Sequence, residues 1–160
     1  MIIDYHTGHG KRGAGELISP LDDDPNSWRA RATNTCFGPG AVKNLRERRK
    51  ELKGFRLRRD SSDSVSAEVI GDLLSYSFLR KDLQLAGVYL ELGTFPVLSV
   101  LDALIDENWT YHNLSMDETR VQRERLLQVF TPDNAEWRRA VWNKAFATTK
   151  SAIEGLTGLR

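Results

Sequence analysis

The strongest constraint on the fold is residues 87–92 (GVYLEL), a mostly apolar run with β-branched and aromatic side chains and glycines on both sides. This pattern predicts a β-strand. A second, shorter strand is predicted for residues 2–6 (IIDYH), at the start of the chain. Three helical patterns follow the strand at 87–92, and the long segment between the two strands is mixed. This order of elements predicts an α/β fold.

Three helices are expected after the strand at residues 87–92, each opened by a capping residue. The expected capping residues are Thr94, Ser115 and Asp133. Pro96 suits the first turn of the first helix, and Gly155 or Gly158 is expected to end the third. In the middle of the chain, residues 41–53 predict a further helix because apolar residues recur there at spacings of three and seven.

Composition indicates a globular domain without a membrane span. The chain has 160 residues and a net charge of +1, which gives no global case for binding nucleic acid or a membrane surface. No uncharged apolar run approaches the roughly 18 residues of a membrane-spanning helix, and the first ten residues carry Asp4 and two histidines, which do not fit a signal peptide. The single cysteine, Cys36, excludes an internal disulfide and a multi-cysteine zinc site. We therefore expect a reducing, cytoplasmic location.

Two local features admit both a functional and a structural interpretation. Residues 8–13 match G-x-G-x-x-G, the dinucleotide fingerprint, but Pro20 follows too soon for the helix that such a site requires. Residues 43–59 hold nine Lys or Arg and two Glu, a local balance of +7. Such a stretch can grip phosphates, and it also suits a solvated helix face with a mobile connector. We expect the second, with no specific nucleic-acid site.

His6 and Glu91 are the candidate functional residues. His6 ends its predicted strand, Asp4 shares its strand face at period two, and glycines follow at once. Glu91 is a carboxylate in the most apolar strand, so it either faces solvent at a sheet edge or lies in a functional site with a partner and a shifted pKa. Both residues lie at strand carboxyl ends, where α/β sheets bind ligands. A carboxylate base acting on a metal-bound water would need this pair and further ligands.

Four segments resemble a known family. They are IDYHTGHGKRGAGELI, GVYLELGTFPVLSVLDAL, DENWTYH and FTPDNAEWRRAVW, and they are spread from residue 3 to residue 142, so the resemblance covers nearly the whole chain. In this order they resemble a domain-of-unknown-function branch of the zinc carboxypeptidase superfamily, which is related to succinylglutamate desuccinylase and aspartoacylase. The resemblance implies that residues 1–160 are a single C-terminal portion of a mixed-sheet zinc-peptidase fold with C-terminal helices.

The resemblance also implies a chemistry. His6 resembles the third zinc ligand of the superfamily, and Glu91 resembles the glutamate that takes the proton from zinc-bound water. The implied activity is zinc-dependent hydrolysis of an amide or peptide bond, with a small peptide or an N-acyl amino acid as substrate. Zinc is the implied cofactor of the complete parent domain.

The chain departs from the superfamily in its ligand set. The first two ligands of the superfamily come from an H-x-x-E motif upstream of the third, and here the residues three after the histidines are His9, Arg12 and Ser115. Because the chain opens directly on a core strand, we expect that an N-terminal half is missing or that the start is misassigned. We therefore expect zinc binding by this chain alone to be weak or absent.

The alternative to an enzyme is a non-catalytic remnant that acts as a binding or interaction module. Association through an unpaired sheet edge is expected for either one, because a core strand without a neighbour invites pairing. An in-frame H-x-x-E in the DNA upstream of Met1 would favour the enzyme, and its absence would favour the remnant.

Overall fold

The computed structural model describes residues 1–19, 24–44, 74, 76, 78, 80 and 82–158. These residues form strands β1 (Ile2–Gly8), β2 (Gly15–Ser19), β3 (Val42–Asn44) and β4 (Gly87–Gly93). They also form helices α1 (Trp28–Phe37), α4 (Val97–Asn113), α5 (Arg120–Phe130) and α6 (Ala135–Thr157). The chain is therefore a mixed α/β protein, as the sequence predicts.

The strands form one sheet in the order β1-β4-β2-β3. β4 lies inside the sheet, where it pairs in parallel with β1 and antiparallel with β2, and β3 pairs in parallel with β2. Both predicted strands are confirmed, and each runs on to a glycine, Gly8 in β1 and Gly93 in β4. Every residue of β4 except Glu91 is buried. The sheet is thus built around residues 87–92, the run that most constrains the fold.

The segment after the glycine-rich loop differs from the prediction. The sequence does not predict β2 or α1, and it predicts a helix over residues 41–53 where the structure has β3. The helix is wrong for Val42–Asn44 because these residues pair with β2, Leu17 opposite Val42, and local periodicity does not register such a long-range contact. Residues 45–53, and all but the first two residues of the basic stretch 43–59, lie outside the described residues.

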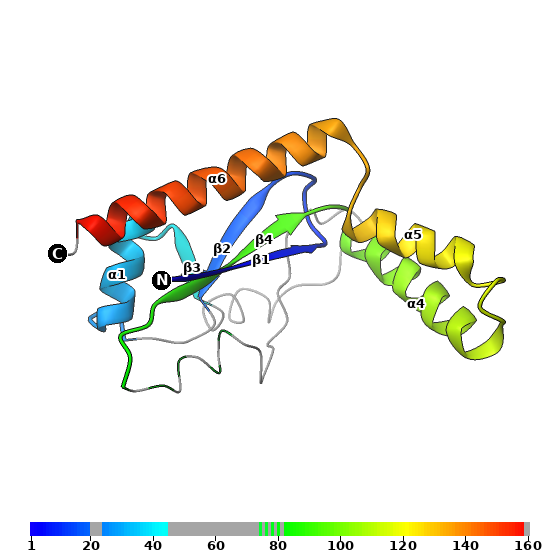
Figure 1. Ribbon diagram of the computed structural model, residues 1–160, viewed down its shortest axis with the longest axis horizontal. Helices are drawn as coiled ribbons and strands as arrows, with labels where there is room; N and C mark the ends of the chain where they lie inside the picture. Colours follow the sequence, from blue (N-terminus) through cyan, green and yellow to red (C-terminus); the bar gives the residue numbers. More distant parts are fainter. Residues whose placement is uncertain are drawn as a thin grey trace.

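The sheet has two different faces because side chains alternate along its strands. α6 covers one face and runs along the sheet from the end of β4 to α1 (Figure 1). The hydroxyl oxygens of Tyr5 on β1 and Thr149 on α6 lie 2.5 Å apart, and Trp137 Nε1 donates to the Gly93 carbonyl oxygen at 2.9 Å. A buried apolar cluster with partly buried neighbours lies on the other face. Its members are Ile18, Leu74, Phe78 and Tyr89, with Ile2 and Leu85 packed against them.

The C-terminal end of α6 packs closely against α1. Ser27 caps α1 by accepting a hydrogen bond from Ala30 N at 3.1 Å. At Gly155 the two helices approach so closely that an added Cβ would lie 2.7 Å from Cys36 Sγ. The Cys36 thiol is buried and lies 3.7 Å from the Ala152 carbonyl oxygen. A glycine at 155 is therefore what lets α1 lie against α6.

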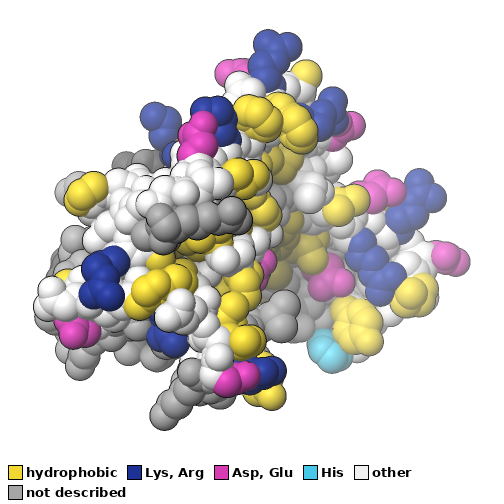
Figure 2. All heavy atoms as spheres, turned by 60° about the vertical axis from the view of Figure 1, so that its left-hand side comes forward, with side chains coloured by type: hydrophobic (Ala, Val, Ile, Leu, Met, Phe, Trp, Pro, Cys, Tyr) yellow, Lys and Arg dark blue, Asp and Glu magenta, His cyan; other side chains and the backbone are white. Residues whose placement is uncertain are grey.

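α6 begins and ends close to its predicted bounds. Asn134 caps it by accepting from Trp137 N at 3.0 Å, so the prediction that Asp133 caps this helix is wrong by one residue. Of the two glycines expected to end the helix, Gly158 is the C-cap and Gly155 lies inside the helix. The outer side of α6 carries the exposed, stacked rings of Trp142 and Phe146, with centroids 6.2 Å apart. In Figure 2, hydrophobic side chains form a band across the face that is drawn.

α4 and α5 form a helical hairpin that projects from one end of the sheet (Figure 1). The buried core of the hairpin consists of Val100, Ala103 and Val129. The predicted capping box before α5 is present, since Ser115 N donates to Glu118 Oε2 at 2.9 Å, although the regular helix begins only at Arg120. Within the described part of the chain, no helix is long and apolar enough to cross a membrane.

Candidate functional site

His6 and Glu91 lie side by side at one end of the sheet. β1 and β4 are parallel, and their register places His6 directly opposite Glu91. Each strand ends two residues later at a glycine, Gly8 opposite Gly93. The structure therefore confirms that both residues lie at strand carboxyl ends, and it makes them neighbours. Paired strands lie roughly 5 Å apart, so the two side chains leave the same face at contact range.

Asp4 orients the ring of His6. It lies two residues earlier on β1, on the same face, and its Oδ2 atom is 3.0 Å from His6 Nε2. The His6 ring also meets the Tyr89 ring edge-on, with centroids 5.6 Å apart. When Nε2 carries the proton shared with Asp4, the lone pair of the ring resides on Nδ1, which is the form that binds a metal. The His6 side chain is 48% exposed, so a ligand can reach it.

Glu91 is a half-buried carboxylate in an otherwise buried strand. Because β4 is an inner strand, the sheet-edge alternative for Glu91 is wrong. Burial is the main cause that raises the pKa of Glu91 above its ordinary value, and the charges of Glu16 and Asp4 raise it further. His6 and His9 act in the opposite direction and lower it. Glu91 therefore lies within a group of titratable side chains, an arrangement that is common at functional sites.

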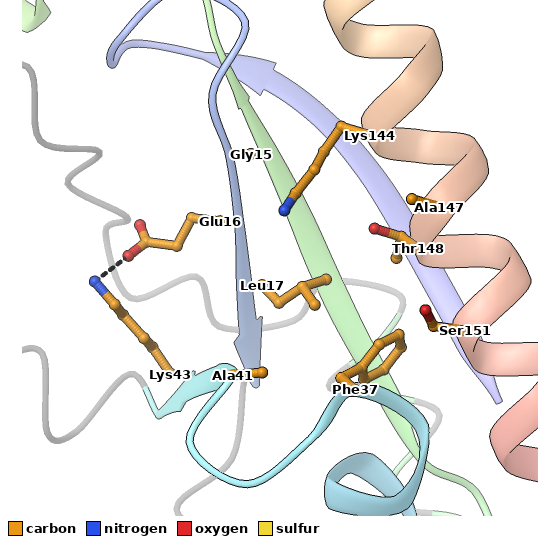
Figure 3. Close-up of a pocket in the computed structure, with 10 residues that line it drawn as sticks. All are labelled: Gly15, Glu16, Leu17, Phe37, Ala41, Lys43, Lys144, Ala147, Thr148 and Ser151. Carbon is orange, nitrogen blue, oxygen red and sulfur yellow. Dashed lines mark ion pairs between the residues drawn. The ribbon is translucent and has the colours of Figure 1, made fainter.

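Glu16 places a second carboxylate next to Glu91. β2 pairs antiparallel with β4, and the register sets Glu16 opposite Glu91. The Glu16 Oε1 atom lies 2.6 Å from the Nζ atom of Lys43 on β3 (Figure 3). Lys43 thus neutralises the outer of two neighbouring carboxylates. The sequence gives no sign of this ion pair, because the pair depends on the register of two strands that the sequence does not predict.

The glycine-rich loop is tied to the end of β4. Gly10 N donates to the Phe95 carbonyl oxygen at 2.8 Å, and Gly13 N donates to the Gly93 carbonyl oxygen at 2.9 Å. A Cβ added at Gly93 would overlap the Lys11 carbonyl oxygen, so only glycine lets the loop close over the strand end. β2 begins two residues after Gly13, where a dinucleotide site would have the start of a long helix.

Thr94 joins β1 to β4 at this same end. Its backbone N and its hydroxyl both donate to the Gly8 carbonyl oxygen, at 2.9 Å and 2.6 Å. The prediction that Thr94 caps α4 is wrong because the hydroxyl is used in this contact, and Pro96 occupies the N-cap position. Thr94 is buried, so these bonds are shielded from water and hold the two strand ends in register.

The described residues offer one histidine that fits the role of a zinc ligand. His6 has the orientation and the carboxylate partner that zinc-binding histidines usually have. Glu91 lies beside it and can exchange a proton. Within the described part of the chain, no group of three or more His, Cys, Asp or Glu is arranged to hold a metal ion. A catalytic zinc needs three protein ligands, so His6 alone does not make a complete zinc site within these residues.

Comparison with protein families gives a match over most of the chain. Residues 1–144 match the family model described as a protein of unknown function (DUF2817). No curated protein and no solved structure gives a significant match. The matched residues include both strand ends that carry His6 and Glu91.

Proposed function

The chain belongs to the DUF2817 family, and from its strand-end geometry we propose that it forms part of a zinc-dependent hydrolase that cleaves an amide or peptide bond. One observation carries this proposal: His6, held by Asp4, is the register partner of Glu91. The proposed metal ligand and the proposed general base are therefore neighbours on one sheet face. The resemblance to the zinc carboxypeptidase superfamily assigns the same two roles to the same two residues.

Glu91 is the proposed general base. In the proposed reaction its carboxylate takes a proton from a water molecule, the water oxygen bonds to the carbonyl carbon, and the carbon–nitrogen bond then breaks. Glu91 returns the proton to the leaving nitrogen, so the group ends in its starting state. Burial raises the pKa of Glu91, which makes its carboxylate a stronger base than an exposed glutamate.

His6 is the proposed zinc ligand, through Nδ1. When bound, zinc would polarise the scissile carbonyl and lower the pKa of the attacking water. Asp4 keeps the proton on Nε2 and fixes the ring angle against Tyr89. The other ligands that the proposal needs would come from outside the described residues.

The proposed substrate class is a small peptide or an N-acyl amino acid, as the resemblance implies. The proposal includes a cytoplasmic location, because the single cysteine excludes the internal disulfides that secreted proteins often use. The proposal also includes association through β1, which has a neighbour on one side only among the described strands.

A zinc titration of the isolated chain tests the ligand assignment. Calorimetry should show weak binding at best, because His6 is one ligand where three are needed. Nuclear magnetic resonance of the histidine rings should show the His6 signals responding before those of His112, which lies exposed on α4. His6→Ala should remove the early response, and the control His112→Ala should leave it unchanged.

One result would correct the expectation of weak binding, and another would contradict the zinc proposal itself. Tight one-to-one binding that His6→Ala abolishes would show that the chain holds a complete ligand set within its own residues. Equal responses of His6 and His112 would remove the ligand role altogether. The second result would favour the non-catalytic binding module.

A further inference from the structure

A pocket of about 410 Å³ lies on the sheet face that α6 covers (Figure 3). Its floor is β2 and the start of β3, one wall is α6, and the other wall is the end of α1. Its volume is within the roughly 300–1,000 Å³ typical of small-molecule sites. Leu17 points toward α6 while Glu16, its neighbour, points to the opposite side of β2 (Figure 3). The pocket therefore opens on the face away from the side chains of His6 and Glu91.

α6 presents three hydrogen-bond donors to this pocket. Lys144, Thr148 and Ser151 follow one another at spacings of four and three residues, so they share one side of the helix. Figure 3 shows the Lys144 ammonium group and the Thr148 hydroxyl directed toward β2. These groups can donate together to one bound group.

Thr148 is the most informative of the three. Its residue is only 5% exposed, and its hydroxyl makes no hydrogen bond within the described part of the chain. The neighbouring Thr149 and the later Thr157 instead donate their hydroxyls back to carbonyl oxygens of the helix. Thr148 lines the pocket, and its hydroxyl is open to the pocket, where water or a bound group can exchange hydrogen bonds with it.

Lys144 is held over the strand by a glycine. A Cβ added at Gly15 would lie 2.6 Å from Lys144 Cγ and 2.9 Å from its Cε, so the aliphatic stem lies directly on the strand backbone. The ammonium group is thereby directed into the pocket (Figure 3). Within the described residues, no carboxylate forms an ion pair with Lys144, whereas Lys43 at the rim is paired with Glu16.

We infer that this pocket binds a monocarboxylate with a short apolar chain. The Lys144 ammonium and the hydroxyls of Thr148 and Ser151 would donate to the carboxylate. The apolar chain would lie against Leu17 on the floor of the pocket and Phe37 on its wall. A dianion such as phosphate fits less well, because the second cation, Lys43, is already neutralised and the Glu16 carboxylate lies at the rim.

Hexanoate is the probe that tests this site. Titrated into the ¹⁵N-labelled chain, it should shift the backbone amide signals of Gly15 and Thr148 in a saturable way and leave that of Glu91 unmoved. Hexanol, which has the same chain without the charge, should give no saturable shift. Inorganic phosphate should bind more weakly than hexanoate.

Lys144→Met keeps the stem over Gly15 and removes the charge, and it should weaken hexanoate binding roughly ten- to hundredfold, the value of a hydrogen bond to a charged group. The matched control is Lys150→Met, also on α6, because Lys150 pairs with Glu154 away from the pocket. It should bind hexanoate as the unmodified chain does. Thr148→Val, which preserves shape, should cost about fivefold.

Three results would overturn the inference. The first is no saturable hexanoate response, and the second is equal weakening by Lys144→Met and Lys150→Met. The third is tighter binding of phosphate than of hexanoate, which would reject the monocarboxylate. None of these results bears on His6 or Glu91, so the pocket and the hydrolase proposal are tested separately.

Discussion

Replacing Glu91 with glutamine should make the protein more stable at neutral pH and should abolish hydrolysis by a complete active site. The variant keeps the shape of the side chain and removes only its charge. The expectation of higher stability follows from where the carboxylate lies. Glu91 is half-buried on an inner strand, and burial is the main cause of its raised pKa.

The sign of the stability change follows from proton binding. Because the native pKa of Glu91 lies above its ordinary value of 4.5, the folded chain binds this proton more tightly than the unfolded chain does. The ionised carboxylate therefore costs stability. The cost is complete above the native pKa, falls as the pH drops through it, and disappears below about 4.5.

The size of the stability change is modest. One pKa unit corresponds to about 1.4 kcal/mol, and solvent that still reaches Glu91 reduces what the shift is worth. We expect Glu91→Gln to raise the free energy of unfolding by on the order of 1 kcal/mol at pH 8 and by almost nothing at pH 4. Urea denaturation followed by tryptophan fluorescence measures this, since Trp137 is buried beside the end of β4.

Glu107→Gln is the matched control. Glu107 lies on α4, 3.8 Å from Arg123, and its loss should change stability by less than about 0.5 kcal/mol. In a zinc-loaded, active preparation, Glu91→Gln should lower turnover by roughly 10²–10⁴-fold, the usual contribution of a general base. A variant that is less stable than the unmodified chain at pH 8 would refute the reasoning from burial. Unchanged turnover per folded, zinc-loaded molecule would refute the catalytic role.

Two further predictions concern other parts of the chain. Gly155→Ala should lower the free energy of unfolding by about 1–3 kcal/mol, because the added Cβ would meet Cys36 across the contact between α6 and α1. Thermal unfolding measures this loss. The control Gly158→Ala should be nearly neutral, because its Cβ would meet nothing closer than 3.6 Å. Equal losses in the two variants would contradict this account of the helix contact. The basic stretch 43–59 should bind polyanions weakly, without sequence preference and less at high salt, in a filter-binding series; sequence-selective binding at physiological salt would overturn this prediction.

The parts of the fold that sequence predicts are those with a local signal strong enough to survive without context. β4 combines apolar, β-branched and aromatic residues between glycines, and α6 combines helical spacing with two glycines near its end, of which Gly158 is the C-cap. The error at the start of α6 shows the limit of such signals. Asp133 and Asn134 are both good capping residues, and in the structure it is Asn134 that accepts from Trp137 N.

The parts that sequence misses are stabilised by contacts from far along the chain. α1 has polar residues such as Thr33 on its inner side, so it lacks an apolar stripe, and its position depends on Gly155 more than a hundred residues later. β2 has five residues and β3 has three, which is too few to show a reliable alternation of apolar and polar residues. Both strands exist because β4 offers an edge to β2, and β2 offers an edge to β3.

The two proposed sites depend on the same alternation of side chains. On β1, Tyr5 turns to α6 and bonds Thr149, so His6 must turn to the opposite face, toward Glu91. On β2 the same rule sends Leu17 to the pocket and Glu16 to the face of Glu91. A shift of one residue in the pairing of either strand would exchange these roles and bury a charge against α6. The bonds of Thr94 fix the end of β1 against the end of β4, and they thereby keep His6 on the same face as Glu91.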